Sequence, residues 1–216
     1  MTQGFDKDYW ESHWQQANGH EAGRQIVPNP YLARETSSLV PGTALDAGCG
    51  EGAEAIWLAA EGWQVTAADI STEVLSRASE RATKGGSAPE RVRWLEADLS
   101  VWKPCEQFDL VTTHYAHPAM PQLAFYERIS DWVAPGGTLL IVGHLHTPGH
   151  GHGHGQQRHG RHPPEQASVT TASITMGLDA IRWDVVTAEE HLRTLINRAG
   201  GAVQLHDVVV RATRRP

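Results

Sequence analysis

The segment Gly48–Gly52, in which three glycines alternate with other residues, constrains the fold of this chain more than any other feature. It follows Thr43–Ala47, a short and mostly apolar run typical of a buried parallel strand. It precedes Ala53–Glu61, whose apolar spacing predicts a helix. Glycine adopts positive φ without steric cost, and its bare backbone lets amide groups approach a ligand closely. The sequence therefore predicts a strand–turn–helix unit whose turn accommodates a flat, extended ligand such as a nucleoside.

Two acidic residues beside this turn indicate which ligand it binds. Asp69 follows the second predicted strand, Gln64–Ala68, where a carboxylate accepts hydrogen bonds from the ribose hydroxyls of an adenosine-containing cofactor. Asp46 precedes Gly48 by two residues, and its negative charge repels a pyrophosphate but attracts the ammonium group of a methionine moiety. The glycine spacing also fits a relaxed form of the dinucleotide fingerprint, so an NAD-type oxidoreductase on a related scaffold remains an alternative.

Strand and helix patterns alternate along the middle of the chain. Beyond the first two strands, apolar runs predict strands at 92–96, 108–113 and 138–142. Helical spacing predicts helices at 72–84 and 119–133. Repeated strand–helix units predict an α/β fold, in which a doubly wound, mostly parallel sheet carries helices on both faces.

The two ends of the chain leave alternatives open. Residues 5–17 place aromatic side chains at helical spacing, which is typical of a helix packed on the core or of a lid over a ligand. We interpret residues 1–40 as a helical lid. Residues 187–198 are compatible with a helix or with the continuation of a strand. The turn-like segment Asn197–Gly201, followed by the alternating pattern of 202–213, favours strand–turn–strand.

Five motifs in the first two thirds of the chain form an ordered set. They are LDAGCGEG at 45–52, Ala-Asp-Ile at 68–70, Glu-Ala-Asp-Leu at 96–99, Phe-Asp-Leu-Val at 108–111 and Ala-Pro-Gly-Gly at 134–137. In this order and spacing they resemble the class I S-adenosylmethionine-dependent methyltransferases. The first two motifs are similar to those of small bacterial members of the tellurite-resistance and thiol-methylating type. The resemblance implies one Rossmann-like domain over residues 1–216, with a seven-stranded sheet in the order 3-2-1-4-5-7-6 and strand 7 antiparallel.

The resemblance also implies which residues bind the methionine end of the cofactor S-adenosylmethionine. Asp46 and the loop residues Gly48, Cys49 and Gly50 would meet the methionine moiety. His114 follows the fourth predicted strand, where members of the family line the sulfonium and the acceptor. These five residues form the methionine half of the predicted cofactor site.

Four further residues form the nucleoside half of the predicted site by the same resemblance. Asp69 would hold the ribose, and Ile70 beside it would flank the adenine. Asp98 would face the adenine amino group, with Leu99 next to it. The alternative for Asp98 is a turn former or helix cap, because aspartate favours both positions.

The segment following the fourth strand, Thr112–Pro118, supplies the candidate catalytic residues. Methyl transfer from a sulfonium depends mainly on proximity and alignment, and it requires a base only when the nucleophile starts out protonated. His114 and His117 are candidate bases because histidine titrates near neutral pH, and Tyr115 is a candidate for orienting the acceptor. The alternative is that these three residues only line the pocket.

Composition and an absent motif narrow the class of acceptor. The formal net charge of -7 argues against a nucleic-acid partner, because phosphate binding requires clustered Lys and Arg. Members of the class that methylate exocyclic amines or protein glutamine typically carry Asn-Pro-Pro-Tyr after strand 4, whereas this chain has Thr-His-Tyr-Ala. A small molecule is therefore the predicted acceptor, with sulfur, oxygen, nitrogen and metalloid oxyanion nucleophiles all open.

A histidine- and glycine-rich segment at 144–164 interrupts the strand–helix pattern before a predicted helix at 167–180. It is interpreted as a flexible insertion without a defined metal site, although a metal-binding protein acting through it is a second alternative function. Two cysteines, the lack of a long apolar stretch and a polar N-terminus predict a cytoplasmic protein without a membrane partner. The sequence leaves the oligomeric state open, a homodimer included.

Overall fold

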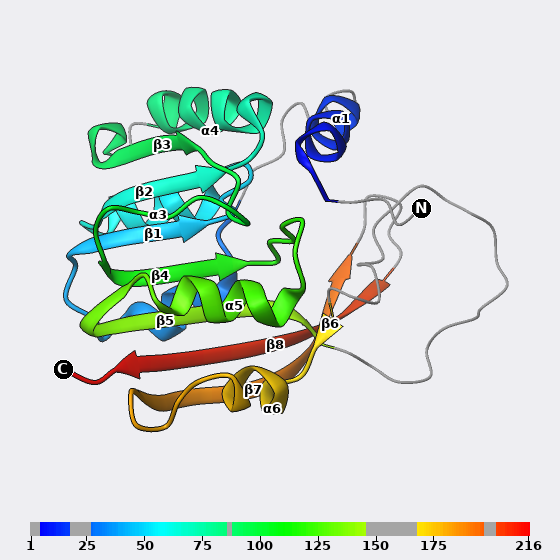
Figure 1. The fold of residues 1–216 in the computed structure, drawn as a ribbon. Helices are drawn as coiled ribbons and strands as arrows, with labels where there is room; N and C mark the ends of the chain where they lie inside the picture. Colours follow the sequence, from blue (N-terminus) through cyan, green and yellow to red (C-terminus); the bar gives the residue numbers. More distant parts are fainter. Residues whose placement is uncertain (1–4, 18–26, 86–87, 146–167, 197–201) are drawn as a thin grey trace, which may run out of the picture.

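The computed structural model describes residues 5–17, 27–85, 88–145, 168–196 and 202–216 (Figure 1). The strands are β1 (Thr43–Ala47), β2 (Gln64–Asp69), β3 (Val92–Glu96), β4 (Phe108–His114), β5 (Val133–Leu145), β6 (Ser168–Val169), β7 (Trp183–Ile196) and β8 (Ala202–Arg214). The α-helices are α1 (Lys7–Ala17), α2 (Pro30–Thr36), α3 (Ala53–Ala60), α4 (Thr72–Gly85), α5 (Gln122–Ser130) and α6 (Thr171–Met176), and η1 (Pro89–Arg91) is a 3₁₀ helix. In this part of the chain, no helix is both long and apolar enough to cross a membrane.

The seven long strands form one sheet in the order β3-β2-β1-β4-β5-β8-β7, and the two-residue strand β6 pairs with β5. Strands β1 to β5 are parallel, whereas β8 is antiparallel to both of its neighbours, β5 and β7. Since β7 and β8 are the sixth and seventh long strands, the predicted order 3-2-1-4-5-7-6 with an antiparallel seventh strand is confirmed. The carboxyl ends of the five parallel strands lie along one edge of the sheet (Figure 1).

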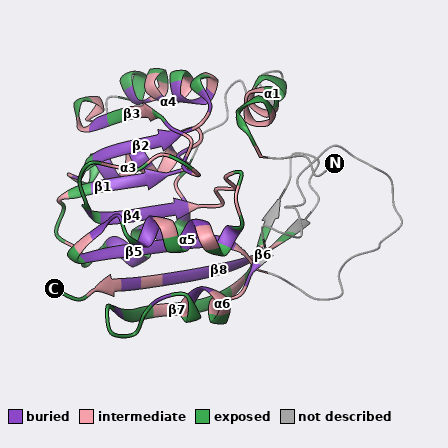
Figure 2. Cartoon of the chain, viewed as in Figure 1, coloured by how far each residue is buried: buried purple, intermediate pink, exposed green. Residues whose placement is uncertain are grey.

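The core has two layers, one on each face of the sheet. Alternate strand residues point to opposite faces, so Leu45 of β1 packs with α5 and α6 while Ala44 packs with α2 and α3. Figure 2 shows that the central strands are buried along their length, whereas the outer surfaces of the helices are exposed. Burial on both faces explains why the central strands, β1, β2, β4 and β5, contain nearly continuous apolar runs in the sequence.

Element boundaries differ from the sequence prediction at three places. The predicted helix at 119–133 is confined to α5, which begins after the N-cap Pro121, whose ψ of 135° is not helical. The helix predicted at 167–180 is the shorter α6, which a reciprocal capping box between Thr170 and Ser173 begins after β6. Strand β5 begins at Val133, before the predicted start. Its register with β4 shifts between Val133 and Thr138, in a stretch that contains Gly136.

The described residues of the ambiguous C-terminal region form two paired strands, as favoured from the sequence. Strands β7 and β8 pair in antiparallel register from Trp183 opposite Arg214 to Ile196 opposite Ala202. The predicted turn at 197–201 lies outside the described residues. His144 and Leu145 belong to β5, so the predicted insertion at 144–164 cannot begin before residue 146, and residues 146–164 lie outside the described part of the chain.

Candidate functional site

The glycine loop between β1 and α3 has the backbone conformation that its sequence predicts. Gly48, Gly50 and Gly52 have φ values of 81°, 47° and 77°, in the left-handed region that favours glycine. A Cβ built on Gly48 would lie 2.3 Å from the Cβ of Ala116, and one on Gly52 would lie 2.6 Å from the Trp94 ring. Close approach as well as φ therefore requires glycine at these two positions.

The amides of the glycine loop donate to β2 rather than standing free. Gly48 N and Cys49 N both donate to the carbonyl oxygen of Ala68, at 2.8 and 3.0 Å. Gly50 N donates to Asp69 Oδ2 at 2.9 Å. This differs from the expectation of ligand-facing amides, because the end of β2 lies close enough to accept them. The loop is therefore fixed to β2 before any ligand binds.

Asp46 lies at the centre of the predicted site with only 1% of its surface exposed. Its Oδ2 has no hydrogen-bond partner among the described residues. Burial, followed by the carboxylates of Glu54 and Asp69, raises the pKa of Asp46 well above its ordinary value. A buried carboxylate oxygen without a partner is costly, so this arrangement favours a bound cation or hydrogen-bond donor.

Asp69, at the carboxyl end of β2, is also buried. Its two oxygens accept from different amides, Oδ2 from Gly50 and Oδ1 from Ser71 at 3.0 Å. Burial raises the pKa of Asp69, while these amide donors oppose the increase. A carboxylate oxygen has two lone pairs, so each oxygen of Asp69 can accept a second hydrogen bond from a ligand hydroxyl. Ile70, next in sequence, is half-buried beside it.

Asp98 and Leu99, the other two predicted nucleoside contacts, have structural partners in this chain. Asp98 Oδ1 accepts from the amide and the hydroxyl of Ser100, at 2.9 and 2.6 Å. These contacts match the alternative of a turn former. Leu99 is buried in the core, and its carbonyl oxygen accepts from Arg128.

The three candidate catalytic residues following β4 have different surroundings. His114 Nδ1 lies 3.4 Å from Thr112 Oγ1, and His114 Nε2 is buried with no hydrogen-bond partner among the described residues. Burial lowers the pKa of His114, so the imidazole is neutral near pH 7. His117 Nδ1 lies 3.1 Å from Gln122 Oε1, and burial lowers its pKa as well. His114 therefore has a buried ring nitrogen that no described residue satisfies.

Tyr115 is directed away from His114 and into a polar cluster that sequence reasoning missed. Its hydroxyl donates to Asp207 Oδ1 of β8 at 2.7 Å and accepts from Arg193 Nη2 of β7 at 2.8 Å. Tyr31 of α2 donates to the same aspartate. A signal was available in the sequence, because Asp207 is a charged residue that directly precedes the apolar run Val208–Val210. We define the cluster as Tyr31, Tyr115, Arg193 and Asp207.

Helix α1 lies beside the carboxyl ends of β1, β2 and β4. The ring of Trp14 is 3.5 Å from a Cβ built on Gly50, which is ordinary van der Waals contact. Glu11 accepts from the amide and hydroxyl of Thr72 at the start of α4, at 2.9 and 3.0 Å. Trp10 Nε1 donates to the carbonyl oxygen of His117 at 3.3 Å. The helix thus contacts the glycine loop, α4 and the segment following β4.

Comparisons with known proteins agree on the class. Residues 44–137 match a family described as a methyltransferase domain. The chain is 32% identical over 142 residues to "Probable thiol methyltransferase 2" of Arabidopsis thaliana, covering 62% of this chain and 60% of that protein. It is 28% identical over 197 residues to thiocyanate methyltransferase 1 of the same plant, covering 88% of this chain and 80% of the relative.

A solved structure shares the whole architecture. Magnesium protoporphyrin IX methyltransferase from Synechocystis PCC 6803 with bound SAH superposes with a TM-score of 0.69 at 18% identity, covering 96% of this chain and 97% of that one. The fold and the glycine loop thus define a Rossmann-like methyltransferase domain. The chain is similar to the class I S-adenosylmethionine-dependent methyltransferases, as the motif set predicts, and S-adenosylmethionine is the cofactor of this class. This similarity favours a methyltransferase over the NAD-type alternative.

The residues at the carboxyl edge of the sheet fit this cofactor. S-adenosylmethionine carries a positive ammonium and a positive sulfonium, and the glycine loop is surrounded by the carboxylates of Asp46, Glu54 and Asp69. The unpartnered oxygen of Asp46 offers an acceptor to one of these charges. In the described part of the chain, no three His, Cys, Asp or Glu side chains are arranged to hold a metal ion. The histidine-rich residues 146–164 lie outside that part.

Proposed function

We propose that this chain transfers the methyl group of S-adenosylmethionine to a small-molecule acceptor. The observation that carries the proposal is Asp46, a buried carboxylate with raised pKa and one unpartnered oxygen beside the glycine loop. Burying such a group without a counter-charge costs free energy that a bound cation recovers. We assign Asp46 to the methionine ammonium, directly or through water, together with the backbone of Gly48, Cys49 and Gly50.

The nucleoside would lie along the end of β2. Asp69 has lone pairs left for the ribose hydroxyls after accepting two backbone amides, and Ile70 offers an apolar contact to the adenine. Asp98 and Leu99 would contribute through the shape of their turn rather than through a free carboxylate, since Asp98 already accepts from Ser100. The cofactor supplies an activated methyl group when bound, and these residues hold and orient it.

His114 is the residue that we assign to the acceptor. Its Nε2 is buried without a partner in the described part of the chain, and its lowered pKa keeps the ring neutral. A neutral imidazole can accept a proton from a nucleophile that starts out protonated. Tyr115 does not suit this task, because burial and Asp207 raise the pKa of its phenol. His117 would line the site with Nδ1 directed to Gln122.

A sulfur nucleophile is the acceptor class that we favour among those open from the sequence. Two relatives are named for a thiol and for thiocyanate, and both nucleophiles are small. A thiol has an ordinary pKa of about 8.5, so a neutral histidine can remove its proton near pH 7, and thiocyanate requires no base. We do not assign a nucleic-acid acceptor, since the net charge is -7.

Helix α1 would act as a lid over the bound cofactor, as the interpretation of residues 1–40 holds. Support comes from its contacts with Gly50, Thr72 and His117, which belong to three different segments around the site. A lid that excludes water strengthens the electrostatic interactions beneath it.

Calorimetry with S-adenosylhomocysteine tests the cofactor assignment directly. We expect saturable binding by the wild-type chain and about a tenfold or greater loss in Asp69→Ala, because charge-assisted hydrogen bonds contribute about 1.5–3 kcal/mol each. Glu61→Gln, at the exposed end of α3, is the matched control and should bind as the wild type does. A folded wild-type protein without affinity for S-adenosylhomocysteine would refute the proposal. Incubation with thiols, thiocyanate, phenols and amines then identifies the acceptor by formation of S-adenosylhomocysteine.

A further inference from the structure

Asp207 gathers hydrogen bonds from three separate elements at the carboxyl edge of the sheet. The residue is fully buried, at 0% exposure, in β8. Its donors are Tyr31 of α2 at 3.1 Å, Tyr115 following β4 at 2.7 Å, and the guanidinium of Arg193 in β7. A carboxylate removed from water requires such donors, because its desolvation is otherwise uncompensated. The cluster therefore joins α2, β4 and β7 through one side chain.

Tyr115 has an unusual backbone for its residue type. Its φ is 55°, and Ala88 is the only other non-glycine residue with positive φ in the described part of the chain. A bulky residue in this region is strained by about 1–3 kcal/mol, and surrounding contacts must hold it there. The contacts in this case are the hydrogen bond from Tyr115 N to Val142 O at 2.9 Å and those of the hydroxyl to Asp207, Arg193 and, at 3.4 Å, Asn29 Nδ2.

The backbone at Tyr115 determines the positions of its two neighbours. His114 ends β4, with its Nε2 unpartnered among the described residues. Ala116 packs so closely against Gly48 that a Cβ there would lie 2.3 Å from its own Cβ. A change of φ at Tyr115 would therefore move the candidate acceptor residue and the wall of the cofactor loop together.

We propose that Asp207 is a positioning residue, which holds Tyr115 in its left-handed conformation and so fixes His114 and Ala116 against the glycine loop. Its effect on turnover rests on the proposed function, whereas its effect on the loop does not. Asp207 touches neither the glycine loop nor His114 directly in the contacts described above, so it acts through Tyr115.

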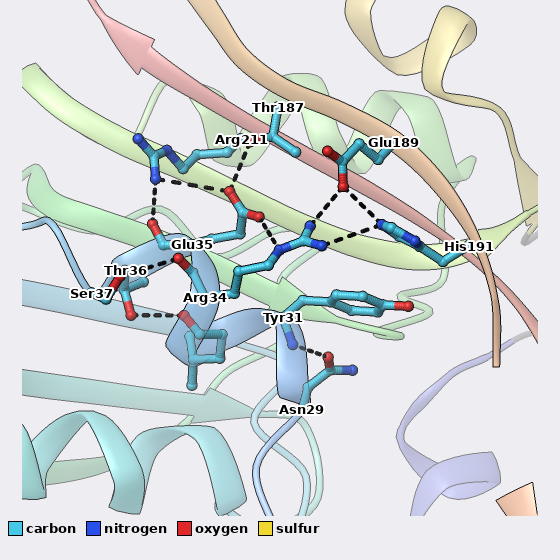
Figure 3. A network of polar contacts seen from close by, with 11 residues as sticks. Asn29, Tyr31, Arg34, Glu35, Thr36, Ser37, Thr187, Glu189, His191 and Arg211 are labelled. Carbon is cyan, nitrogen blue, oxygen red and sulfur yellow. Dashed lines mark hydrogen bonds and ion pairs between the residues drawn. The ribbon is translucent and has the colours of Figure 1, made fainter. Parts of the chain in front are cut away.

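Tyr31 provides a second, independent donor that makes the role of Tyr115 testable. Its ring stacks on His191 of β7 with centroids 5.0 Å apart and planes at 23°. The guanidinium carbons of Arg34 and Arg193 lie 5.1 and 5.4 Å from the Tyr31 ring centroid. Figure 3 shows the ring beside His191, with Arg34 linked by dashed lines to Glu189 and His191. The phenol of Tyr31 thus joins α2 to Asp207, whereas the contact of α2 with the Tyr115 hydroxyl is made by its N-cap residue Asn29 and does not involve that phenol.

Two phenylalanine substitutions form a matched pair. Tyr115→Phe and Tyr31→Phe each remove one hydroxyl from Asp207, but only the first releases the segment next to the glycine loop. In the free, full-length protein, we expect Tyr115→Phe to shift the Gly48 amide and His114 imidazole resonances in ¹⁵N NMR spectra. Tyr31→Phe should leave both resonances near their wild-type positions. Equal shifts, or no shift, in the two variants would overturn the proposal.

Binding and turnover give the functional half of the test. Because a misplacement of about 1 Å in a site costs on the order of 10²-fold, Tyr115→Phe should lower turnover about tenfold or more, with Tyr31→Phe within about twofold. If Tyr115→Phe does not fold, Arg193→Lys replaces it, since lysine keeps the charge but loses the planar fork that reaches both Tyr115 and Asp207. Unshifted Gly48 and His114 resonances in Arg193→Lys would then refute the positioning role. A wild-type chain without affinity for S-adenosylhomocysteine would refute the proposed function, while the NMR comparison would still decide the role of Asp207.

Discussion

Gly48→Ala is the substitution whose cost can be worked out most completely from the structure. Two penalties apply at this position. An alanine at φ 81° is strained by about 1–2 kcal/mol. Its Cβ would also lie 2.3 Å from the Cβ of Ala116, and overpacking of this kind costs about 1–3 kcal/mol. We therefore expect Gly48→Ala to lower the free energy of unfolding by about 2–5 kcal/mol.

Gly136→Ala separates the two penalties. Gly136 has nearly the same φ, 80°, but a Cβ built on it meets no atom of the described residues within 4 Å. Its substitution should therefore cost only the backbone strain of about 1–2 kcal/mol. Both replacements reduce the conformational entropy of the unfolded chain equally, so that effect cancels in the comparison.

A double-mutant cycle assigns the overpacking cost of Gly48→Ala to its contact with Ala116. Ala116→Gly removes the methyl group that Gly48→Ala strikes, so the double variant should recover about 1–3 kcal/mol relative to the sum of the single variants. Urea unfolding, with the transition followed by tryptophan fluorescence and by circular dichroism, measures all four proteins. Equal costs for Gly48→Ala and Gly136→Ala, together with additivity in the cycle, would show that the glycine loop and Ala116 do not meet as described.

Three further predictions address charge and capping. Affinity for S-adenosylhomocysteine should weaken as pH falls through the raised pKa of Asp46, because in the proposed site the ionised carboxylate binds the ammonium. Asp46→Asn should reduce this pH dependence when affinity is measured by calorimetry over a pH series. An unchanged slope in the variant would contradict the assignment. Burial, followed by the charge of His117, lowers the pKa of His144 from 6.5 to about 4. As pH falls, the unfolded chain therefore binds a proton at this residue at a higher pH than the folded chain does. On the order of 2 kcal/mol of stability should be lost between pH 6.5 and pH 4. His144→Asn should remove that loss in urea titrations at the two pH values, and equal pH dependence in both proteins would count against it. Thr170→Ala removes the side-chain acceptor of the α6 capping box and should cost about 1 kcal/mol in the same unfolding assay, with no cost if α6 begins elsewhere.

The sheet and the glycine loop were predictable because the sequence patterns that indicate them are local. An apolar run of five or six residues, a glycine-rich turn and a helical repeat all lie within about twenty residues of one another. The ends of β1 and β3 agree with the sequence expectation, and for β1 the reason is that buried strands in a parallel sheet are mostly apolar. Asp46 and Asp69 stand out for the same reason, as acids placed where an apolar strand ends.

The polar cluster was not predictable by such reasoning, because its members are distant in sequence. Tyr31 and Asp207 are 176 positions apart, and Tyr115 and Asp207 are 92 apart. Asp207 alone stands out, as a charged residue before an apolar run, but nothing in the sequence names its partners, and only the order of strands brings them together. The conformation of Tyr115 likewise left no trace in the sequence, because tertiary contacts rather than residue type impose its positive φ.

The position of β8 has a consequence for how the protein assembles. This strand is synthesised after the other described strands, yet it lies between β5 and β7. Until it is in place, β5 presents an unpaired edge, which is a template for association with other chains. Asp207 belongs to the same strand, so its hydrogen bonds with Tyr31, Tyr115 and Arg193 form only when β8 pairs with β5 and β7. A nascent chain that has made the whole glycine loop and both of its acids should therefore still lack an ordered acceptor side, and should depend on rapid insertion of β8 to avoid aggregation.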